Sequence, residues 1–219
     1  MAACLLRIEG LKKTYDQQTV FNDLSLQLTE GEIVAITGPS GCGKTTLLNL
    51  IAGLDKPDQG DIVIDGQSIL ALNEHHRTLL RRRSIGFIFQ FFNLIPTLTV
   101  AENCCLPLEL NNLKIHQQQV LEQLNEVGLA TKHDHFPEQL SGGEQQRVAI
   151  IRALAHQPKL ILADEPTGNL DQTTSEVMGE FLYQQVKHKQ CALLVVTHSQ
   201  ILADQADRIL PMHNKHLST

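Results

Sequence analysis

The sequence predicts an α/β domain organised around a phosphate-binding loop. Residues 38–46, GPSGCGKTT, fit the pattern G-x-x-x-x-G-K-[ST]. The apolar run 33–37 in front of the loop predicts a buried strand, and residues 46–52, closed by Gly53, predict a helix. A further buried strand at 160–163 ends in two carboxylates, at the position where open α/β sheets place their ligands.

The glycines of this loop allow backbone N–H groups to surround phosphate oxygens, and the start of the following helix adds partial positive charge. Lys44 is expected to reach the β- and γ-phosphates, and Thr45 to offer its hydroxyl to Mg²⁺. The expected nucleotide contacts of the loop are Gly38, Pro39, Ser40, Gly41, Cys42, Gly43, Lys44, Thr45 and Thr46. The alternative is a glycine-rich turn with an unrelated lysine, but the strand before the loop and the helix after it favour nucleotide binding.

The chain before the loop predicts two early strands, at 5–9 and 24–28. Leucines in the second alternate with polar residues, as in a half-buried antiparallel strand. Residues 11–15 lead into a polar turn. Tyr15 has two interpretations, an ordinary core or surface residue or an aromatic face that stacks on a purine.

After the loop helix, the sequence predicts a strand at 61–64, a helix at about 73–83 and a strand at 85–89 that is followed by Gln90. Residues 81–83 are three arginines that could contact acidic lipid or a partner. A run of three charges is usually a solvated helix face, so that interpretation is preferred.

Residues 91–98, FFNLIPTL, are apolar without a clear period. They are either core packing or an exposed patch that docks a partner. Residues 116–127 predict a helix with one apolar face. The stretch from about 91 to 157 is mostly helical and lies between two core strands, so it is expected to form a subdomain.

Residues 140–144, LSGGE, open another helix. Ser141 with Glu144 three residues later forms a capping box. The two glycines between them each cost about 1 kcal/mol relative to alanine, and a cap alone does not require them. A backbone approached by an anion does, so these residues are a candidate second phosphate site.

Two carboxylates, Asp164 and Glu165, follow the strand 160–163. Asp164 is expected to hold Mg²⁺, directly or through water, and Glu165 to orient or deprotonate the attacking water. An exposed acidic turn is the alternative, which the phosphate loop makes less favourable. The buried strand 192–196 leads to His198, which is either structural or a contact to the γ-phosphate. The remaining predicted elements are a helix at about 173–187 and a strand at 207–210.

Composition limits the classes of function. The net charge of the 219-residue chain is −6, which argues against a nucleic-acid binder led by phosphate contacts. The sequence shows neither an apolar run long enough to span a membrane nor a signal peptide. Five cysteines without C-x-x-C spacing indicate a reducing compartment and a cytoplasmic protein. One domain over residues 1–219 is the simplest organisation.

Together these motifs resemble the ATP-binding cassette (ABC) ATPases over essentially the whole chain. The most specific part is LSGGE at 140–144 followed by QQR, in the company of the phosphate loop and the later carboxylates. Residues 91–103 and 163–171 resemble a narrower group, the ATPases of bacterial lipoprotein-release, macrolide-export and cell-division-type complexes. The resemblance implies a P-loop NTPase (RecA-like) core with an N-terminal antiparallel β subdomain and an inserted helical subdomain.

The resemblance also implies roles for matched residues. Tyr15 matches the adenine-stacking aromatic, and Gln90 matches the glutamine that meets Mg²⁺ and the attacking water and senses the membrane partner. Asp164 and Glu165 match the metal-binding and catalytic acids, and His198 matches the switch histidine. Across a dimer, Ser141, Gly142 and Gly143 match the signature that touches the opposite γ-phosphate, and Asp171 matches the acidic residue of the dimer-crossing loop.

Three positions depart from the family pattern. Glu144 stands where glutamine is commonest across the superfamily, although glutamate fits the narrower group. Cys42 replaces a common serine and is either a tolerated small residue or an oxidisable thiol at a helix N-terminus. Residues 213–215 stand where an Asp-Gly turn is common, which leaves the register of the last strand open.

The implied protein is an ATP-hydrolysing motor subunit that uses ATP and Mg²⁺. Two chains arranged head to tail would close both anion sites on each triphosphate, and the resulting stroke would pass to an integral membrane transporter subunit through residues 90–98. A lipoprotein-release or macrolide-export complex on the cytoplasmic face of the inner membrane is expected. The alternative is a soluble ABC-type ATPase in cell division, translation or DNA repair. A DNA-repair ATPase would carry a long coiled-coil insertion, which this sequence does not show. A translation factor would usually carry two cassettes, whereas this sequence has one. A small-molecule kinase would lack LSGGE, which is present here.

Overall fold

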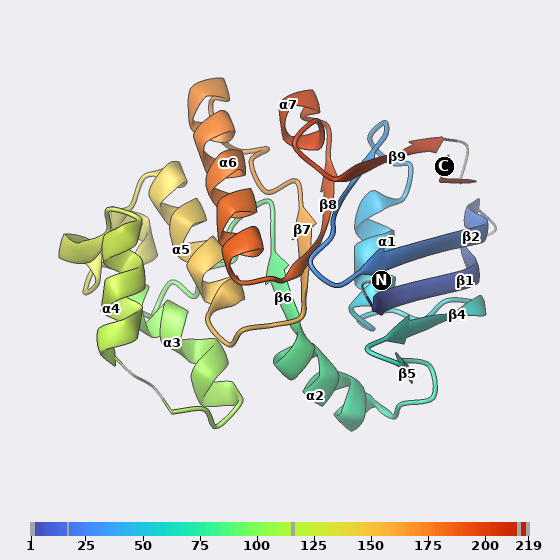
Figure 1. Ribbon diagram of the computed structural model, residues 1–219, viewed down its shortest axis with the longest axis horizontal. Coiled ribbons are helices and arrows are strands. Elements are labelled where there is room, and N and C mark those ends of the chain that lie inside the picture. The colour runs from blue at the N-terminus through green and yellow to red at the C-terminus, as the bar shows by residue number, and fades with distance from the viewer. Residues whose placement is uncertain (1–2, 17, 115–116, 214–215, 218–219) are drawn as a thin grey trace.

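A six-stranded sheet forms the centre of the molecule (Figure 1). The computed structural model describes residues 3–16, 18–114, 117–213 and 216–217. The strand order is β10-β9-β3-β8-β7-β6, parallel from β9 to β6, with β10 antiparallel at the edge. The strands are β3 (Ile33–Thr37), β6 (Ile85–Ile88), β7 (Leu160–Asp164), β8 (Ala192–Thr197), β9 (Arg208–His213) and β10 (His216–Leu217). The predicted α/β fold is confirmed. The open question on residues 213–215 falls largely on 214–215, which lie outside the described residues.

Both faces of this sheet are covered, as the continuous apolar runs predict. In β3, Val34 and Ile36 face a core shared with helix α1, whereas Ile33 and Ala35 face a core shared with helix α6. These helices are α1 (Lys44–Ile51) and α6 (Gln172–His188), and the short helix α7 (Gln200–Ala203) packs beside α6.

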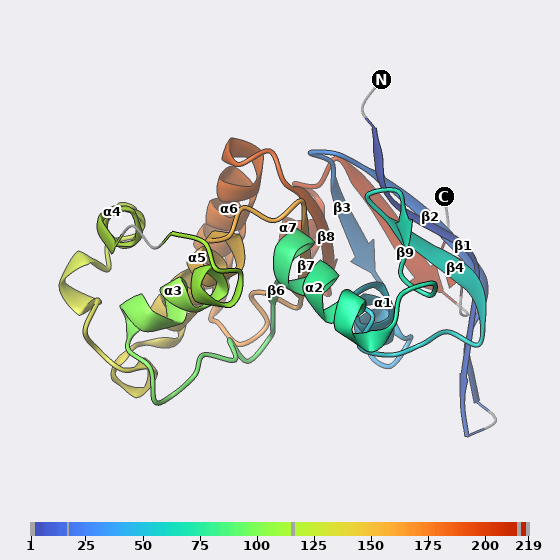
Figure 2. The ribbon, with the colours of Figure 1, turned by 90° about the horizontal axis from the view of Figure 1, so that it is seen from below.

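A second, antiparallel sheet lies beside the first, with the order β2-β1-β4-β5 (Figure 2). Its strands are β1 (Cys4–Tyr15), β2 (Gln18–Thr29), β4 (Gln59–Ile64) and β5 (Gln67–Ser68). The first strand is longer than the predicted 5–9, because β1 continues through 11–15 to Tyr15, and the predicted polar turn follows at Asp16. Register shifts and a left-handed Gly10 (φ 61°) interrupt the simple alternation there, so the pattern hides the strand.

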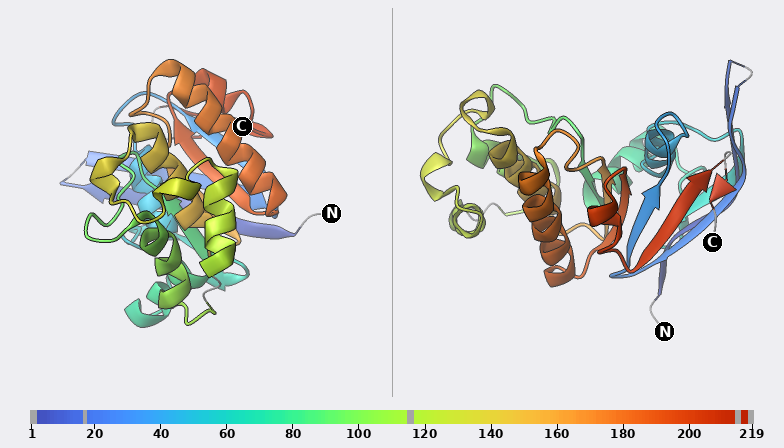
Figure 3. Two further views of the ribbon diagram at one scale, coloured as in Figure 1. Left: turned by 90° about the vertical axis from the view of Figure 1, so that its left-hand side faces the viewer. Right: turned by 90° about the horizontal axis from the view of Figure 1, so that it is seen from above.

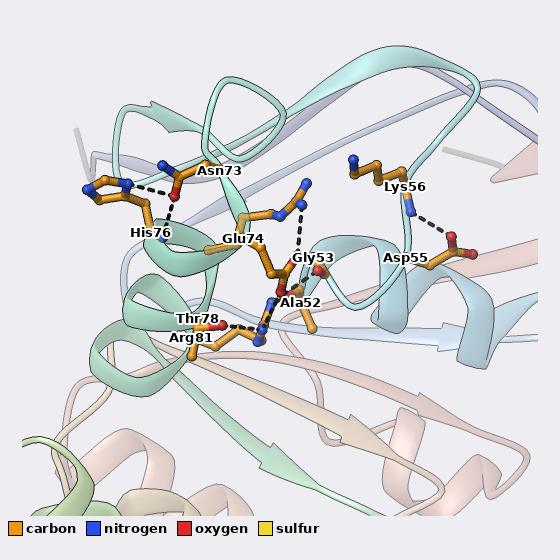
Figure 4. Close-up of polar contacts among 10 residues, drawn as sticks. Ala52, Gly53, Asp55, Lys56, Asn73, Glu74, His76, Thr78 and Arg81 are labelled. Carbon is orange, nitrogen blue, oxygen red and sulfur yellow. Dashed lines mark hydrogen bonds and ion pairs between the residues drawn. The ribbon is translucent and has the colours of Figure 1, made fainter.

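Helix α2 (Glu74–Ser84) holds the end of α1 through one arginine of the triple-arginine run. Arg81 donates to the carbonyls of Gly53 at 3.0 Å and Ala52 at 3.5 Å, and to Glu74 at 3.1 Å (Figure 4). A cation at the C-terminus of a helix is favoured by the helix dipole. The solvated-face interpretation is therefore wrong for Arg81, while the other two arginines of the run are exposed.

Helices α3 (Val100–Leu110), α4 (Gln117–Glu126) and α5 (Gly142–Leu154) lie together at one end of the molecule (Figures 1 and 3). Their facing side chains form a separate buried cluster that includes Val100, Leu124 and Val148. We propose that about 91–157 forms a helical subdomain within one domain spanning 1–219. The opposite face of α5 packs on the central sheet, so this helix belongs to both parts.

Gly86 shows how closely α5 approaches the sheet. A Cβ on Gly86 of β6 would lie 2.3 Å from the carbonyl oxygen of Ala153 in α5. Only glycine permits this contact, which fixes the C-terminal half of α5 on β6. In the part of the chain that the structure describes, no helix combines the length and apolar character required to cross a membrane.

Candidate functional site

The carboxyl ends of four parallel strands meet at one edge of the central sheet, where the sequence predicted a ligand. A cavity of about 590 Å³ opens there. Its lining residues are Tyr15, Gln18, Val20, Ser40, Gly41, Gly43, Lys44, Thr45, Thr46, Gln90, Asp164, Glu165, Gly168 and His198. The structure thus brings together predicted residues from five separate segments of the chain. Gln18, Val20 and Gly168 were not predicted.

The phosphate loop connects β3 to α1 and leaves the start of α1 without a side-chain cap. Gly43 occupies the N-cap position, and the first turn carries no acidic residue. A Cβ at Gly43 would lie 2.7 Å from the Val20 side chain, and φ is 107°, so a glycine is required. The free N–H groups at this helix start suit an anionic ligand.

Lys44 is buried at 7% exposure and its amine is held by the loop itself. Its Nζ donates to the carbonyls of Gly38 at 2.9 Å and Pro39 at 3.1 Å, and lies 3.1 Å from Nε2 of His198. The hydroxyl of Ser40 lies 3.3 Å from the same imidazole nitrogen. The cation of the phosphate loop and the histidine after β8 are therefore direct neighbours.

Cys42 is placed differently from the other loop residues. Its thiol packs against the hydrophobic core and does not line the cavity. A Cβ on Gly38 would lie 3.1 Å from this sulfur, so the small side chain fits beneath the loop. This position favours the tolerated-residue interpretation of Cys42.

Asp164 ends β7 next to Thr45 of the phosphate loop. Burial raises the pKa of the Asp164 carboxyl above its ordinary value, although a hydrogen bond with Thr45 and the charge of Lys44 oppose this shift. The Asp164 carboxylate and the Thr45 hydroxyl are oxygen donors of the kind that a divalent cation such as Mg²⁺ prefers.

Glu165 adopts the left-handed conformation, with φ of 44°. This conformation is strained for a residue other than glycine and is commonest at functional sites. The Glu165 N–H donates to the carbonyl of Val196 in β8 at 2.9 Å, and its Oε2 accepts the backbone N–H of His198 at 3.1 Å. The carboxylate is therefore fixed across the ends of β7 and β8.

Gln90 follows β6 and faces the turn after Glu165. Its carbonyl accepts a hydrogen bond from the side chain of Asn169 at 2.6 Å. A Cβ on Gly168 would lie 3.3 Å from Nε2 of Gln90, so a glycine at 168 leaves room for the amide. Gln90 and Glu165 consequently line the same cavity from different strands.

Tyr15 is 44% exposed at the rim of the cavity and is held by residues that the sequence did not indicate. Its hydroxyl donates to Asp55, whose other oxygen pairs with Lys13 at 3.0 Å. The Lys13 amine also lies 4.6 Å from the centre of the Tyr15 ring. Burial and the bond to Asp55 raise the pKa of Tyr15 to about 12. No local pattern could reveal a partner 40 residues away.

The LSGGE helix does not line this cavity. Its Ser141 and Glu144 form the predicted capping box, with the Ser141 N–H donating to Glu144 at 2.8 Å. A Cβ on Gly142 would lie 3.3 Å from Leu170, and one on Gly143 would lie 2.9 Å from Thr174. Close packing within the chain is therefore a second reason for a small residue, above all at Gly143, so these glycines do not by themselves identify an anion site. Their role toward a phosphate stays a prediction.

Asp171 also lies outside the cavity and has a structural function in this chain. It is the N-cap of α6, accepting the Thr174 N–H at 3.1 Å and the Thr174 hydroxyl at 2.6 Å. These bonds hold the pKa of Asp171 below its usual value. Any contact it makes with a second chain would be additional to this cap.

The fold and the site together define a P-loop nucleotide-binding protein. A family model described as ABC transporter matches residues 21–168. The chain belongs to the ABC transporter family, and it is an ATP-binding ATPase of that family.

Individual relatives agree with this assignment. The chain is 47% identical over 219 residues to an uncharacterized ABC transporter ATP-binding protein of Mycobacterium tuberculosis, covering 97% of this chain and 88% of the relative. It is 42% identical to the lipoprotein-releasing system ATP-binding protein LolD of Legionella pneumophila, covering 97% and 96%. A dimeric structure of the ATP-binding cassette MJ0796 bound to ADP and Pi superimposes with a TM-score of 0.88 at 39% identity, covering 98% and 97%.

Proposed function

We propose that this chain is the ATP-hydrolysing motor subunit of a bacterial ABC transporter complex of the lipoprotein-release or macrolide-export type. The observation that carries the proposal is the convergence of Lys44, Asp164, Glu165 and His198 on one cavity beside Gln90. Relatives at 42% identity over nearly the full chain bear the name of a lipoprotein-releasing system ATP-binding protein, which supports this type of complex.

In the proposed site, the triphosphate lies at the start of α1. Lys44 would exchange its bonds to two loop carbonyls for charge-assisted bonds to the β- and γ-phosphates. The uncapped N–H groups at the start of α1, from Lys44 to Thr46, would donate to the remaining phosphate oxygens. Tyr15 would stack on the adenine at the rim, since its ring is already held by Asp55.

The oxygen donors at the strand ends fit Mg²⁺. No group of three or more His, Cys, Asp or Glu that could hold a metal by itself occurs among the described residues. Mg²⁺ characteristically uses few protein ligands together with substrate phosphates, so Thr45, Asp164 and Gln90 are a suitable set. When bound there, Mg²⁺ would neutralise charge on the phosphate oxygens.

Glu165 would accept the proton of the attacking water. Its carboxylate is fixed by the His198 N–H, while Oε1 makes no hydrogen bond among the described residues. The water oxygen would form the new bond to the γ-phosphorus, the bond between this phosphorus and the β,γ-bridging oxygen would break, and ADP would leave. His198 would contact the γ-phosphate through the imidazole that now lies beside Lys44.

A second copy of the chain would complete the site. Ser141, Gly142 and Gly143 begin α5 away from the cavity, so in this proposal they meet the γ-phosphate held by the opposite chain. Asp171 would contribute from the turn that precedes α6. The MJ0796 cassette is dimeric, which supports a dimer for this chain, and we infer its head-to-tail arrangement from the two separate anion sites.

The membrane partner would dock at an apolar groove beside Gln90. This groove of about 270 Å³ lies between β6 and α3, and includes Phe87, Ile95 and Leu110 in its lining. Phe91 lies in the sequence between the lining residues Phe89 and Asn93 and is 72% exposed, which favours the docking interpretation of residues 91–98. The protein would thereby be held on the cytoplasmic face of the inner membrane.

Purification of the tagged chain from detergent-solubilised membranes tests the proposal. We expect an integral membrane protein to co-purify and to stimulate an ATPase activity that Lys44→Ala abolishes. Phe91→Ser should weaken the co-purification, whereas Leu121→Ser, which changes an exposed leucine on α4, should not. ATPase activity without any membrane protein would favour the non-transport alternative. An absence of ATPase activity would contradict the motor function itself.

A further inference from the structure

Arg152 of α5 is only 9% exposed, so its positive charge must be compensated by hydrogen bonds within the protein. Its guanidinium makes two hydrogen bonds among the described residues, both to backbone carbonyls. Nη1 donates to the carbonyl of Asn93 at 2.6 Å, and Nη2 donates to the carbonyl of Phe92 at 2.8 Å. Burying a cation is unfavourable unless it is well bonded, and an apolar side chain would fill a helix interface at lower cost. The arginine therefore needs an explanation other than packing.

The two carbonyls belong to residues in a strained conformation. Phe92 has φ of 59° and Asn93 has φ of 48°, both left-handed. This region is unfavourable for a bulky residue such as phenylalanine. The turn comes two residues after Gln90, so the conformation of Phe92 and Asn93 determines how the chain carries Gln90 toward the cavity.

The part of helix α5 that carries Arg152 is itself held firmly against the central sheet. The next residue, Ala153, contacts Gly86 of β6 so closely that no Cβ fits between them. The chain leaves β6 at Ile88, passes Gln90, and turns back at 92–93 to the guanidinium. Further along, the fully buried Asn103 of α3 bonds to the backbone of Ile95 and Leu98. The segment is thus tied at 92–93 to α5 and at 95–98 to α3.

From these contacts we propose that Arg152 is a positioning residue that holds the Gln90 segment in its left-handed turn and links this segment to the LSGGE helix. The inference rests on the proposed function, because it assigns Arg152 a part in orienting Gln90. A planar guanidinium presents its N–H groups in a rigid fork that fits two neighbouring carbonyls at a fixed angle, whereas the three donors of a lysine amine share one nitrogen on a flexible stem. Arg152→Lys should consequently keep the positive charge but lose the fixed geometry of the two hydrogen bonds to the carbonyls of Phe92 and Asn93.

The first measurement is steady-state hydrolysis of ATP by the full chain. In Arg152→Lys we expect kcat to fall about 10- to 100-fold, as displaced catalytic groups commonly cause, while KM changes less than about threefold. Arg152 does not line the nucleotide cavity, so ATP binding should persist. Arg83→Lys, a matched change at an exposed position on α2, should leave both constants unaltered.

The second measurement is rescue by glycine. Asn93→Gly favours positive φ without strain, so it should restore much of the kcat lost in Arg152→Lys. Asn112→Gly is the matched control, because Asn112 is also left-handed (φ 53°) but lies beyond α3 and outside the segment. Restoration by neither glycine, or equally by both, would overturn the proposal.

Hydrogen exchange of the nucleotide-free chain separates this inference from the proposed function. Peptides covering 90–95 should exchange several-fold faster in Arg152→Lys and slow again with Asn93→Gly, whereas peptides from β1 and β2 should not change. This readout stands even if the wild-type chain hydrolyses no ATP. Unchanged exchange at 90–95 together with an unchanged kcat would show that Arg152 does not position the segment.

Discussion

His198 and Glu165 meet at two points across the ends of neighbouring strands. The backbone N–H of His198 donates to Oε2 of Glu165 at 3.1 Å, and Nε2 of the His198 imidazole lies 3.3 Å from Oε1. The main-chain bond fixes the carboxylate without needing a particular charge on the imidazole. Oε1 is a buried acceptor that makes no hydrogen bond among the described residues.

Glu165→Gln should retain ATP binding but slow hydrolysis about 10²- to 10⁴-fold, because the amide still accepts the His198 N–H but cannot take the proton of water. Single-turnover hydrolysis by the purified chain with its partner measures the effect. Glu180→Gln makes the same change at an exposed position on α6 and should be neutral. Near-normal turnover in Glu165→Gln would remove this residue from the role of base.

Asp164→Asn should raise the melting temperature of the nucleotide-free protein at about pH 7. The pKa of Asp164 is raised in the folded state, so the folded chain binds this proton more tightly than the unfolded chain, and the ionised carboxylate opposes folding. The advantage of asparagine should therefore shrink as the pH falls toward the ordinary pKa of 3.8. Thermal melts across this pH range measure the difference in melting temperature. Asp134→Asn is the control, because the Asp134 side chain is 83% exposed. A stabilisation by asparagine that grows as the pH falls would contradict the predicted direction of the pH dependence.

In the presence of ATP, the same variant should lose the extra thermal protection that Mg²⁺ gives over ATP with a chelator. Binding of a ligand to the folded state raises its stability by mass action, so a lost metal ligand removes that increment. Equal protection by Mg²⁺ in both proteins would place the metal elsewhere.

Tyr15→Ala should weaken ATP binding by about 1–3 kcal/mol, the usual effect of losing an aromatic ring that stacks on a base. Tyr15→Phe keeps the ring, loses only the bond to Asp55, and should bind nearly as well. Titration with a fluorescent ATP analogue measures both. Inorganic tripolyphosphate, used as a competitor, has no base and should bind all three proteins alike. A parallel loss for tripolyphosphate would show that Tyr15 acts on the phosphate loop.

Gly142→Asp in the Glu165→Gln background should block ATP-dependent dimerisation, because it places a negative charge near the proposed γ-phosphate contact. The chain is otherwise expected to be monomeric without ATP and dimeric when ATP binds but is not cleaved. Light scattering with and without ATP measures the assembly. Since a Cβ here lies 3.3 Å from Leu170, Gly142→Ala is needed to isolate the effect of packing. Dimerisation of the aspartate variant would place the second phosphate site elsewhere.

The edge of the sheet that carries the candidate site was predictable because its signals are local. The phosphate loop and the Asp164-Glu165 pair each directly follow a short buried strand, and parallel strands end at a common edge. Helix α3 was not predicted, because Pro107 lies inside it and masks its period. Its capping box between Thr99 and Glu102 was the available signal.

The contacts that hold the site in place could not be predicted from the sequence. Asp55 reaches Tyr15 across 40 residues, and Arg152 reaches Asn93 across 59 residues. For the glycines of LSGGE, the sequence suggested a ligand contact where a long-range packing contact was overlooked. An unusual local composition was explained by a ligand alone, although Gly143 meets Thr174 of a helix that lies far along the sequence.

The position of β3 in the sheet has a consequence for synthesis of the protein. The strand that leads into the phosphate loop pairs on one side with β8 and on the other with β9, both from the last quarter of the chain. On the ribosome, β1 and β2 can pair as soon as they emerge, but Ile33–Thr37 must wait for more than 150 further residues before either neighbour exists. Until then its apolar edges are open to chaperones and to misplaced strands, and a nascent chain stalled before β8 would carry the loop sequence without a folded nucleotide site.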